Sequence, residues 1–581
     1  MDYQQVQDQQ KAKAVEQAGA SVPLASTAMS ETPSPVSAGG TGSFMADLTA
    51  ALDAYASGSS ALKAIDAELS GMKEIEVPEL KERKGLSKFF YNLFHGKQAK
   101  KEAAAVEEAE QKKAAQEQRR TELGDQKEAA NKSMGDALAQ FKTLMGAATK
   151  SNIKEMINNE PVVRRIMATM PEANVKSTLD LLYPEMDEAH MDLFLDMITA
   201  RFGVPIVDSS KDRINKLPDD VKAYVLHTIQ VQKADGTIEK KQAQPLNWTL
   251  AALKKIYAAY LTIPADHLKL VKCLIHYSDA EDGGAAWGNA GVYYANYFKD
   301  REERKEGDGG GTCCSDSKDM RNGMNKMTLT VIHELGHVVD GRNNNYGYSK
   351  SADFRKWSKW VEVANDAEAV VNYMIDSMNG KPFKGELSDD ALKLAKTIGQ
   401  EMVKNQSSLL NSWSKSQALI NTKVRAAEKL TDAEKDVLSA KFCDSTIESN
   451  LLYHIWMGFG GHTSASYLGC YNFTNVMKGM KRPFYQGYNN DAWFSFDQSK
   501  WSNKISAYQY RCPKEEFAET YASYHVAPTA THVVDGKEVA YKKGEKTPSG
   551  LKTWFEEKKL HLMDPSKVEG SSPIKDEKMA S

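Results

Sequence analysis

MNKMTLTVIHELGHVVD, residues 324–340, is the stretch that decides how this chain is interpreted, and its pattern predicts a single helix. His333 and His337 lie four residues apart, so a helix places both imidazoles on one face, one turn from each other. Both can then bind one zinc ion, and Glu334 between them can reach a water at that ion. The pattern therefore predicts the site of a zinc metallopeptidase.

The residues around the motif favour a buried active-site helix. Apolar side chains flank it at positions 329, 331, 332, 338 and 339. Gly336 has no side chain and lets another element approach the helix closely. The alternative interpretation is an ordinary core helix that carries two hydrogen-bonded histidines.

Length and composition narrow the class of protein. The chain has 581 residues, of which 41% are hydrophobic and 26% charged, with a formal net charge of −3. This length predicts roughly two to four domains, and the near-neutral balance gives no indication of a nucleic-acid partner. The six cysteines form no Cys-x-x-Cys pair, which favours mostly reduced thiols.

Targeting signals are sparse. No apolar run approaches the length of a transmembrane helix, so we expect no transmembrane span. The polar N-terminus lacks the basic and apolar regions of an ordinary signal peptide. We therefore expect a cytoplasmic protein, or an effector that a specialised bacterial secretion system exports, for example into a host cell.

The pattern upstream of the motif predicts a small sheet. Leu268–Tyr277 and Ala290–Tyr297 are rich in β-formers and are predicted to be strands, with a turn at Gly283-Gly284 between them. The order of strand, strand and metal helix suits an edge strand beside a zinc site. An extended peptide substrate could add to that edge by β-augmentation.

A catalytic zinc ion needs a third protein ligand. The long metzincin motif would require Gly at position 340 and His at position 343, but the chain has Asp340 and Asn343, which excludes that class. Glu362, expected on the next helix, lies 25 residues after His337 and is one candidate.

A second acidic segment offers another candidate. In Glu515-Glu516-Phe517-Ala518-Glu519, Glu515 and Glu519 share one face of a predicted helix. One could bind zinc while the other accepts a hydrogen bond from a histidine N–H.

These two motifs together resemble the catalytic domain of the anthrax lethal factor family, a gluzincin-type family, and are similar to the related proline-specific endopeptidases of clostridia. Members carry a His-Glu-x-Gly-His helix, a Glu-x-Phe-Ala-Glu helix whose first Glu binds zinc, and a Tyr seven residues before that Glu. The resemblance implies Zn²⁺ bound by His333, His337 and Glu515, with Glu519 supporting a histidine. It also implies that Tyr508 donates to the developing oxyanion.

The resemblance covers about residues 248–562 and departs from the family in one respect. Glu515 follows His337 by 178 residues, far more than in compact members. Helices at about 353–457 would then be an insertion, and Glu362 stays open as the alternative ligand. The mechanism implied is peptide hydrolysis with Glu334 as the general base.

The resulting prediction for the fold is α+β and mostly helical, with a zincin-like catalytic domain after a helical N-terminal region. The predicted parts are a disordered N-terminus that could carry an export signal (1–43), a helical or coiled-coil arm (44–150), a helical domain (151–216), the metallopeptidase domain with its insertion (217–563) and a disordered tail (564–581).

Two functions follow as hypotheses. One is a zinc endopeptidase that cleaves a protein or peptide substrate, as a bacterial toxin or secreted effector. The other is a catalytically inactive zincin-fold protein that serves as an interaction partner or scaffold. The N-terminal helical region could bind a secretion chaperone or another partner.

Overall fold

The computed structural model is mostly helical, with small sheets. It describes residues 43–79, 86–232, 238–277, 283–296, 305, 320–363, 372, 375–376, 387–404, 413–443, 484–486 and 493–560. The ends that were predicted to be disordered, 1–43 and 564–581, lie outside the described residues, except for Ser43. Among the described residues, no helix is both long and apolar enough to cross a membrane.

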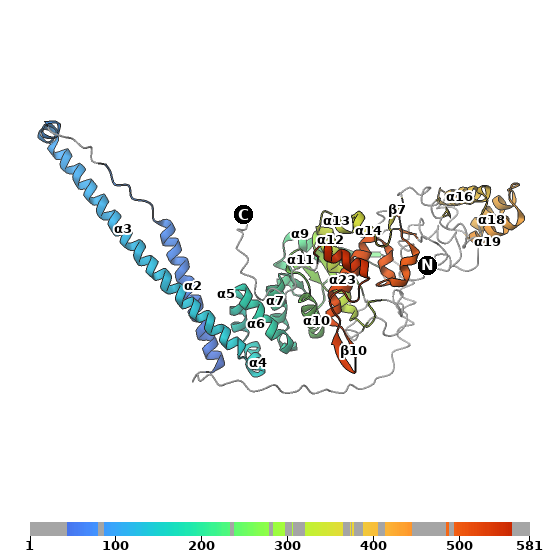
Figure 1. Ribbon diagram of the computed structural model, residues 1–581, viewed down its shortest axis with the longest axis horizontal. Helices are drawn as coiled ribbons and strands as arrows, with labels where there is room; N and C mark the ends of the chain where they lie inside the picture. The colour runs from blue at the N-terminus through green and yellow to red at the C-terminus, as the bar shows by residue number, and fades with distance from the viewer. Residues whose placement is uncertain are drawn as a thin grey trace.

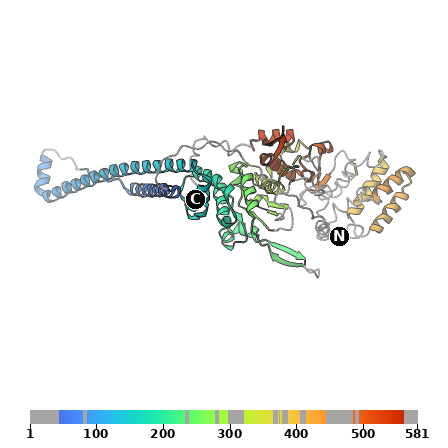
Figure 2. The same ribbon diagram turned by 90° about the horizontal axis from the view of Figure 1, so that it is seen from below.

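Two long helices form an arm that extends away from the rest of the described chain (Figure 1; Figure 2). They are α2 (Phe44–Gly71) and the 61-residue α3 (Leu86–Gly146). The two helices contact each other, and their Leu48, Leu52 and Phe141 are buried in a hydrophobic cluster that also includes residues of the next two helices along the chain. Most of the arm is exposed, because long stretches of α3 carry only polar residues and alanine.

Four shorter helices connect the arm to the sheet. They are α4 (Lys150–Asn158), α5 (Glu160–Thr169), α6 (Glu172–Leu182) and α7 (Met191–Phe202). Proline sets several of their limits, since it fits the first turn of a helix but not its interior. Pro161 lies in the first turn of α5, and Pro171 is the N-cap of α6.

A four-stranded sheet lies next to the predicted metal helix. Its strand order is β1 (Ile206–Val207), β4 (Cys273–Ile275), β6 (Val292–Asn296) and β5 (Gly283–Trp287). β1, β4 and β6 are parallel, and β5 pairs antiparallel with β6. Helices α10 (Leu250–Tyr260) and α12 (Lys326–Arg342) pack together, and α12 contacts β5 and β6. β5 is therefore the edge strand nearest the His-Glu helix.

The turn predicted at Gly283-Gly284 is wrong, because both residues begin β5. Gly284 pairs with Ala295. A Cβ at Gly284 would lie 2.8 Å from the Tyr294 carbonyl oxygen and 2.8 Å from Glu334 Cγ. Glycine is present here because the strand passes close to the site, not because the chain turns.

The boundary expected between residues 216 and 217 does not divide the packing. β1 precedes it, yet pairs in register with β4, Ile206 with Leu274 and Val207 with Ile275. One hydrophobic cluster also continues from Leu48 in the arm to Phe555 near the end of the described chain. The helical segment and the sheet therefore share a core.

Within the predicted insertion, the described residues are helical in part. α16 (Asp389–Lys404), α18 (Trp413–Arg425) and α19 (Asp432–Cys443) pack against one another. Val361–Val363, however, forms strand β7, which pairs with β9 (Trp493–Ser495), and β9 pairs with β8 (Phe484–Gln486). Residues 444–457 of the insertion lie outside the described residues.

The remaining helices and strands are α8 (Lys211–Asn215), α9 (Asp219–Val225), β2 (Thr228–Gln232), β3 (Ile238–Gln242), α11 (Ala265–Leu268), α13 (Gly347–Lys350), α14 (Ala352–Arg355), α23 (Pro513–Val526), β10 (Thr531–Val534), β11 (Lys537–Ala540) and α24 (Ser549–Glu557). Helix α23 is buried along nearly its whole length and packs across α12. This crossing places the second acidic segment against the His-Glu helix.

Candidate metal centre

Helix α12 carries the two histidines. Its N-cap is Asn325, whose Oδ1 accepts a hydrogen bond from the Thr328 N–H at 2.9 Å. The ring centroids of His333 and His337 lie 4.8 Å apart, one turn along the same face. His333 is buried and His337 is partly buried. The spacing predicted from the sequence is therefore realised on a helix.

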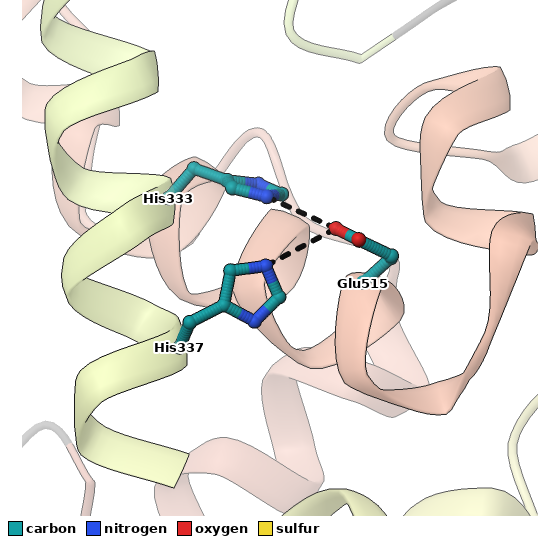
Figure 3. Close-up of side chains that lie close together, drawn as sticks. All are labelled: His333, His337 and Glu515. Carbon is teal, nitrogen blue, oxygen red and sulfur yellow. Dashed lines mark hydrogen bonds and ion pairs between the residues drawn. The ribbon is translucent and has the colours of Figure 1, made fainter. Parts of the chain in front are cut away.

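Helix α23 brings Glu515 to both imidazoles (Figure 3). Glu515 Oε2 lies 3.1 Å from His333 Nε2 and 3.2 Å from His337 Nε2. The two helices can approach this closely because a Cβ at Gly336 would already lie 3.0 Å from Ala518 Cα. A separation of 178 residues along the chain is thus closed by one tight helix crossing.

The donor set fits a zinc ion. The ligand atoms of His333, His337 and Glu515 all lie within 4.8 Å of one another. Among the described residues, these three form the group of His, Cys, Asp or Glu side chains that could hold a metal ion. Two ligand atoms at zinc bond lengths on a tetrahedral ion lie about 3.3 Å apart, close to the separations between Glu515 Oε2 and the two nitrogens. Two imidazoles and one carboxylate are also a ligand set of catalytic zinc sites.

The electrostatics of the three groups are strongly coupled. Burial opposes a proton on His333, yet the carboxylates of Glu515 and Glu519 raise its pKa to about 10. Burial likewise opposes charge on Glu515, but the two histidines hold the pKa of that carboxyl well below its usual range. The carboxylate therefore favours positive charge between itself and the imidazoles, whether a proton or a metal ion supplies it.

The Glu334 side chain extends from α12 toward the edge strand β5. It is buried, and burial raises the pKa of its carboxyl. A Cβ at Gly284 of β5 would lie 2.9 Å from Glu334 Oε1, so only a glycine backbone leaves room for this side chain. The carboxylate is thus confined beside the strand that an extended peptide could join.

Glu519 lies beside the other ring nitrogen of His333, Nδ1. Its Oε1 lies 3.0 Å from His333 Nδ1 and accepts a hydrogen bond from Arg321 Nη1 at 3.2 Å. Its Oε2 accepts from Ser506 Oγ at 2.7 Å. Burial would raise the pKa of Glu519, but Arg321 and His333 lower it to about 2. A carboxylate on Nδ1 leaves Nε2 of His333 as the nitrogen directed toward Glu515.

Tyr508 also lies at this site. Its half-buried ring packs edge-on against His333, with the ring centroids 5.6 Å apart. It belongs to the 3₁₀ turn Ala507–Arg511, immediately before α23. The residue that the resemblance implied as an oxyanion donor is therefore adjacent to the two histidines and Glu515.

Glu362 does not join the cluster. It lies on strand β7 rather than on a helix, its side chain is exposed, and its Oε2 accepts a hydrogen bond from Arg355 Nη1 at 3.0 Å. The helix expected at this position fails because Val361–Val363 pairs with β9. Of the two candidates for a third ligand, the structure places Glu515 beside the histidines.

Several residues at the site were not found from the sequence. Arg321 and Ser506 contact Glu519, and Glu516 is a fully buried carboxylate bonded by Ser358 and Trp360. Burial raises the pKa of Glu516 to about 7, although these hydrogen bonds oppose the shift. No local sequence motif indicates these contacts. Arg321, Ser358 and Trp360 lie far from α23 in the chain, and Ser506 precedes a turn that has no regular periodicity.

Comparison of the chain with protein-family models, with curated proteins and with solved structures finds no match.

Proposed function

We propose that this chain is a zinc-dependent endopeptidase that hydrolyses peptide bonds of a protein substrate, with a zincin-like catalytic domain related to the anthrax lethal factor family. The observation that carries the proposal is the contact of His333 and His337 with Glu515. Two motifs far apart in the chain meet at ligand distances, each on a buried helix. Glu334 and Tyr508 lie at the same place, which an ordinary histidine-bearing core helix does not require.

His333, His337 and Glu515 would hold the zinc ion. When bound, zinc polarises a carbonyl and lowers the pKa of a water. Glu334 takes a proton from the attacking water and later delivers it to the leaving amine. The Glu334 carboxylate packs against the backbone of β5 at Gly284, and this contact limits the positions that the carboxylate can take. Tyr508 donates a hydrogen bond to the oxygen of the scissile carbonyl as negative charge develops there.

The edge strand supports a peptide as the substrate. β5 is at the end of the strand order and, among the residues that the structure describes, pairs only with β6. Its backbone passes the Glu334 side chain at Gly284. An extended peptide that hydrogen-bonds to the other side of β5 would lie alongside the general base.

The proposal is tested by the Glu334→Gln variant of the full chain. We expect wild-type protein loaded with zinc to cleave members of a peptide library, and Glu334→Gln to keep its zinc and lose cleavage by at least about 10²-fold, in line with the contribution of a general base. Metal content by mass spectrometry is the control for the integrity of the site. Zinc-loaded wild type that cleaves no library member would instead support the scaffold hypothesis.

A further inference from the structure

Helix α23 carries a third buried acid that faces away from the metal ligands. Glu516 follows Glu515 directly, so its side chain leaves the helix about 100° further round. Its Oε1 accepts hydrogen bonds from Ser358 Oγ and from Gln509 Nε2, the latter at 3.0 Å. Its Oε2 accepts from Trp360 Nε1 at 2.6 Å. A fully buried carboxylate with three donors is a fixed anchor.

Gln509 connects this anchor to the turn that carries Tyr508. While its Nε2 donates to Glu516, its Oε1 accepts from the Ile505 N–H at 2.6 Å. The Gln509 side chain is fully buried and so closes the turn from residue 505 to residue 509. Gln509, at the end of the turn, therefore hydrogen-bonds both to Ile505 at its start and to Glu516, the residue after Glu515.

The other side of the turn is tied to Glu519. Ser506 Oγ donates to Glu519 Oε2 at 2.7 Å and accepts from the Tyr508 N–H at 3.1 Å. Tyr508 therefore lies between two residues, Ser506 and Gln509, whose side chains bind two different carboxylates of α23. The helix that supplies Glu515 also fixes the position of the tyrosine.

We propose that Gln509, held by Glu516, is a positioning residue for Tyr508, an inference that rests on the proposed peptidase function for its catalytic consequence. The hydrogen bonds of the Gln509 side chain go to Glu516 and to the Ile505 N–H, not to the histidines or Glu515. Gln509 acts by fixing the turn, so that the Tyr508 hydroxyl is presented to the scissile carbonyl without reorganisation in the transition state. Its loss should lower kcat, leaving KM and zinc content nearly unchanged.

The test uses Gln509→Met, which preserves side-chain length and removes both hydrogen bonds. We expect kcat to fall about tenfold, part of the 10²–10³ that loss of an oxyanion donor costs, with KM changed less than about twofold. In a Tyr508→Phe background the same substitution should have no further effect, because the group that it positions is gone. Glu516→Gln, which leaves one of the three donors without an acceptor, should behave in the same way.

The second readout does not depend on activity. With 3-fluorotyrosine at position 508 of the full chain as purified, we expect one narrow fluorine resonance that broadens or splits in Gln509→Met. Thr520→Val is the matched control, since it removes a buried hydrogen bond from Thr520 Oγ1 to the Glu516 carbonyl on the same helix and leaves the hydrogen bonds of Gln509 and Ser506 in place. Thr520→Val should leave both the resonance and kcat unchanged.

An unchanged resonance in Gln509→Met, together with equal losses of kcat in the wild-type and Tyr508→Phe backgrounds, would overturn the inference and leave Gln509 a purely structural residue. The failure of the proposed function looks different. A wild-type chain that cleaves no peptide removes the kinetic part, yet the fluorine resonance still decides whether Gln509 fixes Tyr508.

Discussion

Helices α12 and α23 pack closely at Gly336, and replacing this glycine with alanine should weaken zinc binding. An added Cβ would lie 3.0 Å from Ala518 Cα and 3.1 Å from Tyr521 Cβ. Carbon atoms in contact prefer about 3.5–4.0 Å, so the two helices must separate by about 0.5 Å. Glu515 lies one turn before Ala518 on α23, and it would move away from both imidazoles with the helix.

Two effects of Gly336→Ala on the free energy of unfolding oppose each other, whereas its effect on zinc affinity has one direction. Alanine gains about 1 kcal/mol of helix propensity over glycine, whereas overpacking costs about 1–3 kcal/mol. The free energy of unfolding should therefore change by between nothing and a loss of about 2 kcal/mol. Zinc affinity should fall about 10–100-fold, as it does when a contact that orients a ligand is lost.

The assay is competition for zinc with a chelating dye, alongside chemical denaturation of the same protein. Gly124→Ala is the matched control, because Gly124 is exposed in the middle of α3 and an added Cβ would meet nothing within 4 Å. It should stabilise the chain by up to about 1 kcal/mol and leave zinc affinity unchanged. Wild-type zinc affinity in Gly336→Ala would refute the reasoning that this helix crossing sets the ligand geometry.

Three further outcomes are expected. Tyr508→Phe should lower kcat by about 10²–10³ while KM and zinc content stay nearly constant, as steady-state kinetics and metal analysis can show. Asp340→Ala should lower the free energy of unfolding by about 1–3 kcal/mol, measured by denaturant unfolding. The reason is that the buried Asp340 Oδ1 accepts hydrogen bonds from the Tyr348 and Ser349 N–H groups at 3.0 and 3.1 Å. Asp340→Asn keeps that acceptor and should lower the free energy of unfolding by less. Removing zinc with a chelator should lower the thermal midpoint reversibly, since a metal at 100 times its Kd stabilises by about 2.7 kcal/mol, and an unchanged midpoint would argue against a bound metal in the folded chain.

The sequence was sufficient where local periodicity and fixed spacing determine the structure. The helix of the His-Glu motif was predicted at 324–340 and is found at Lys326–Arg342. Strands were predicted at Leu268–Tyr277 and Ala290–Tyr297. The structure has β4 at Cys273–Ile275 and β6 at Val292–Asn296, but Leu268 belongs to helix α11. The predicted contact between Glu515 and the histidines is present in the structure, although it depended on a resemblance and not on the pattern alone.

Tertiary pairing determines the features that the sequence did not show. β1 has only two residues, too few for any periodicity, and exists because it pairs with β4. Glu362 was expected on a helix, but pairing with β9 makes its segment a strand. Gly284 was interpreted as a turn glycine, whereas its role is to leave space for Glu334. Each depends on a partner distant in the chain.

The central claim, that Glu515 completes a zinc site with His333 and His337, is tested most directly by measuring zinc per chain in the purified protein and in two alanine variants. We predict one tightly bound zinc ion in the wild type and in Glu362→Ala, whose side chain is exposed and paired with Arg355. Glu515→Ala should lose tight zinc. Retention of one tightly bound zinc ion by Glu515→Ala, or its loss from Glu362→Ala, would contradict the account.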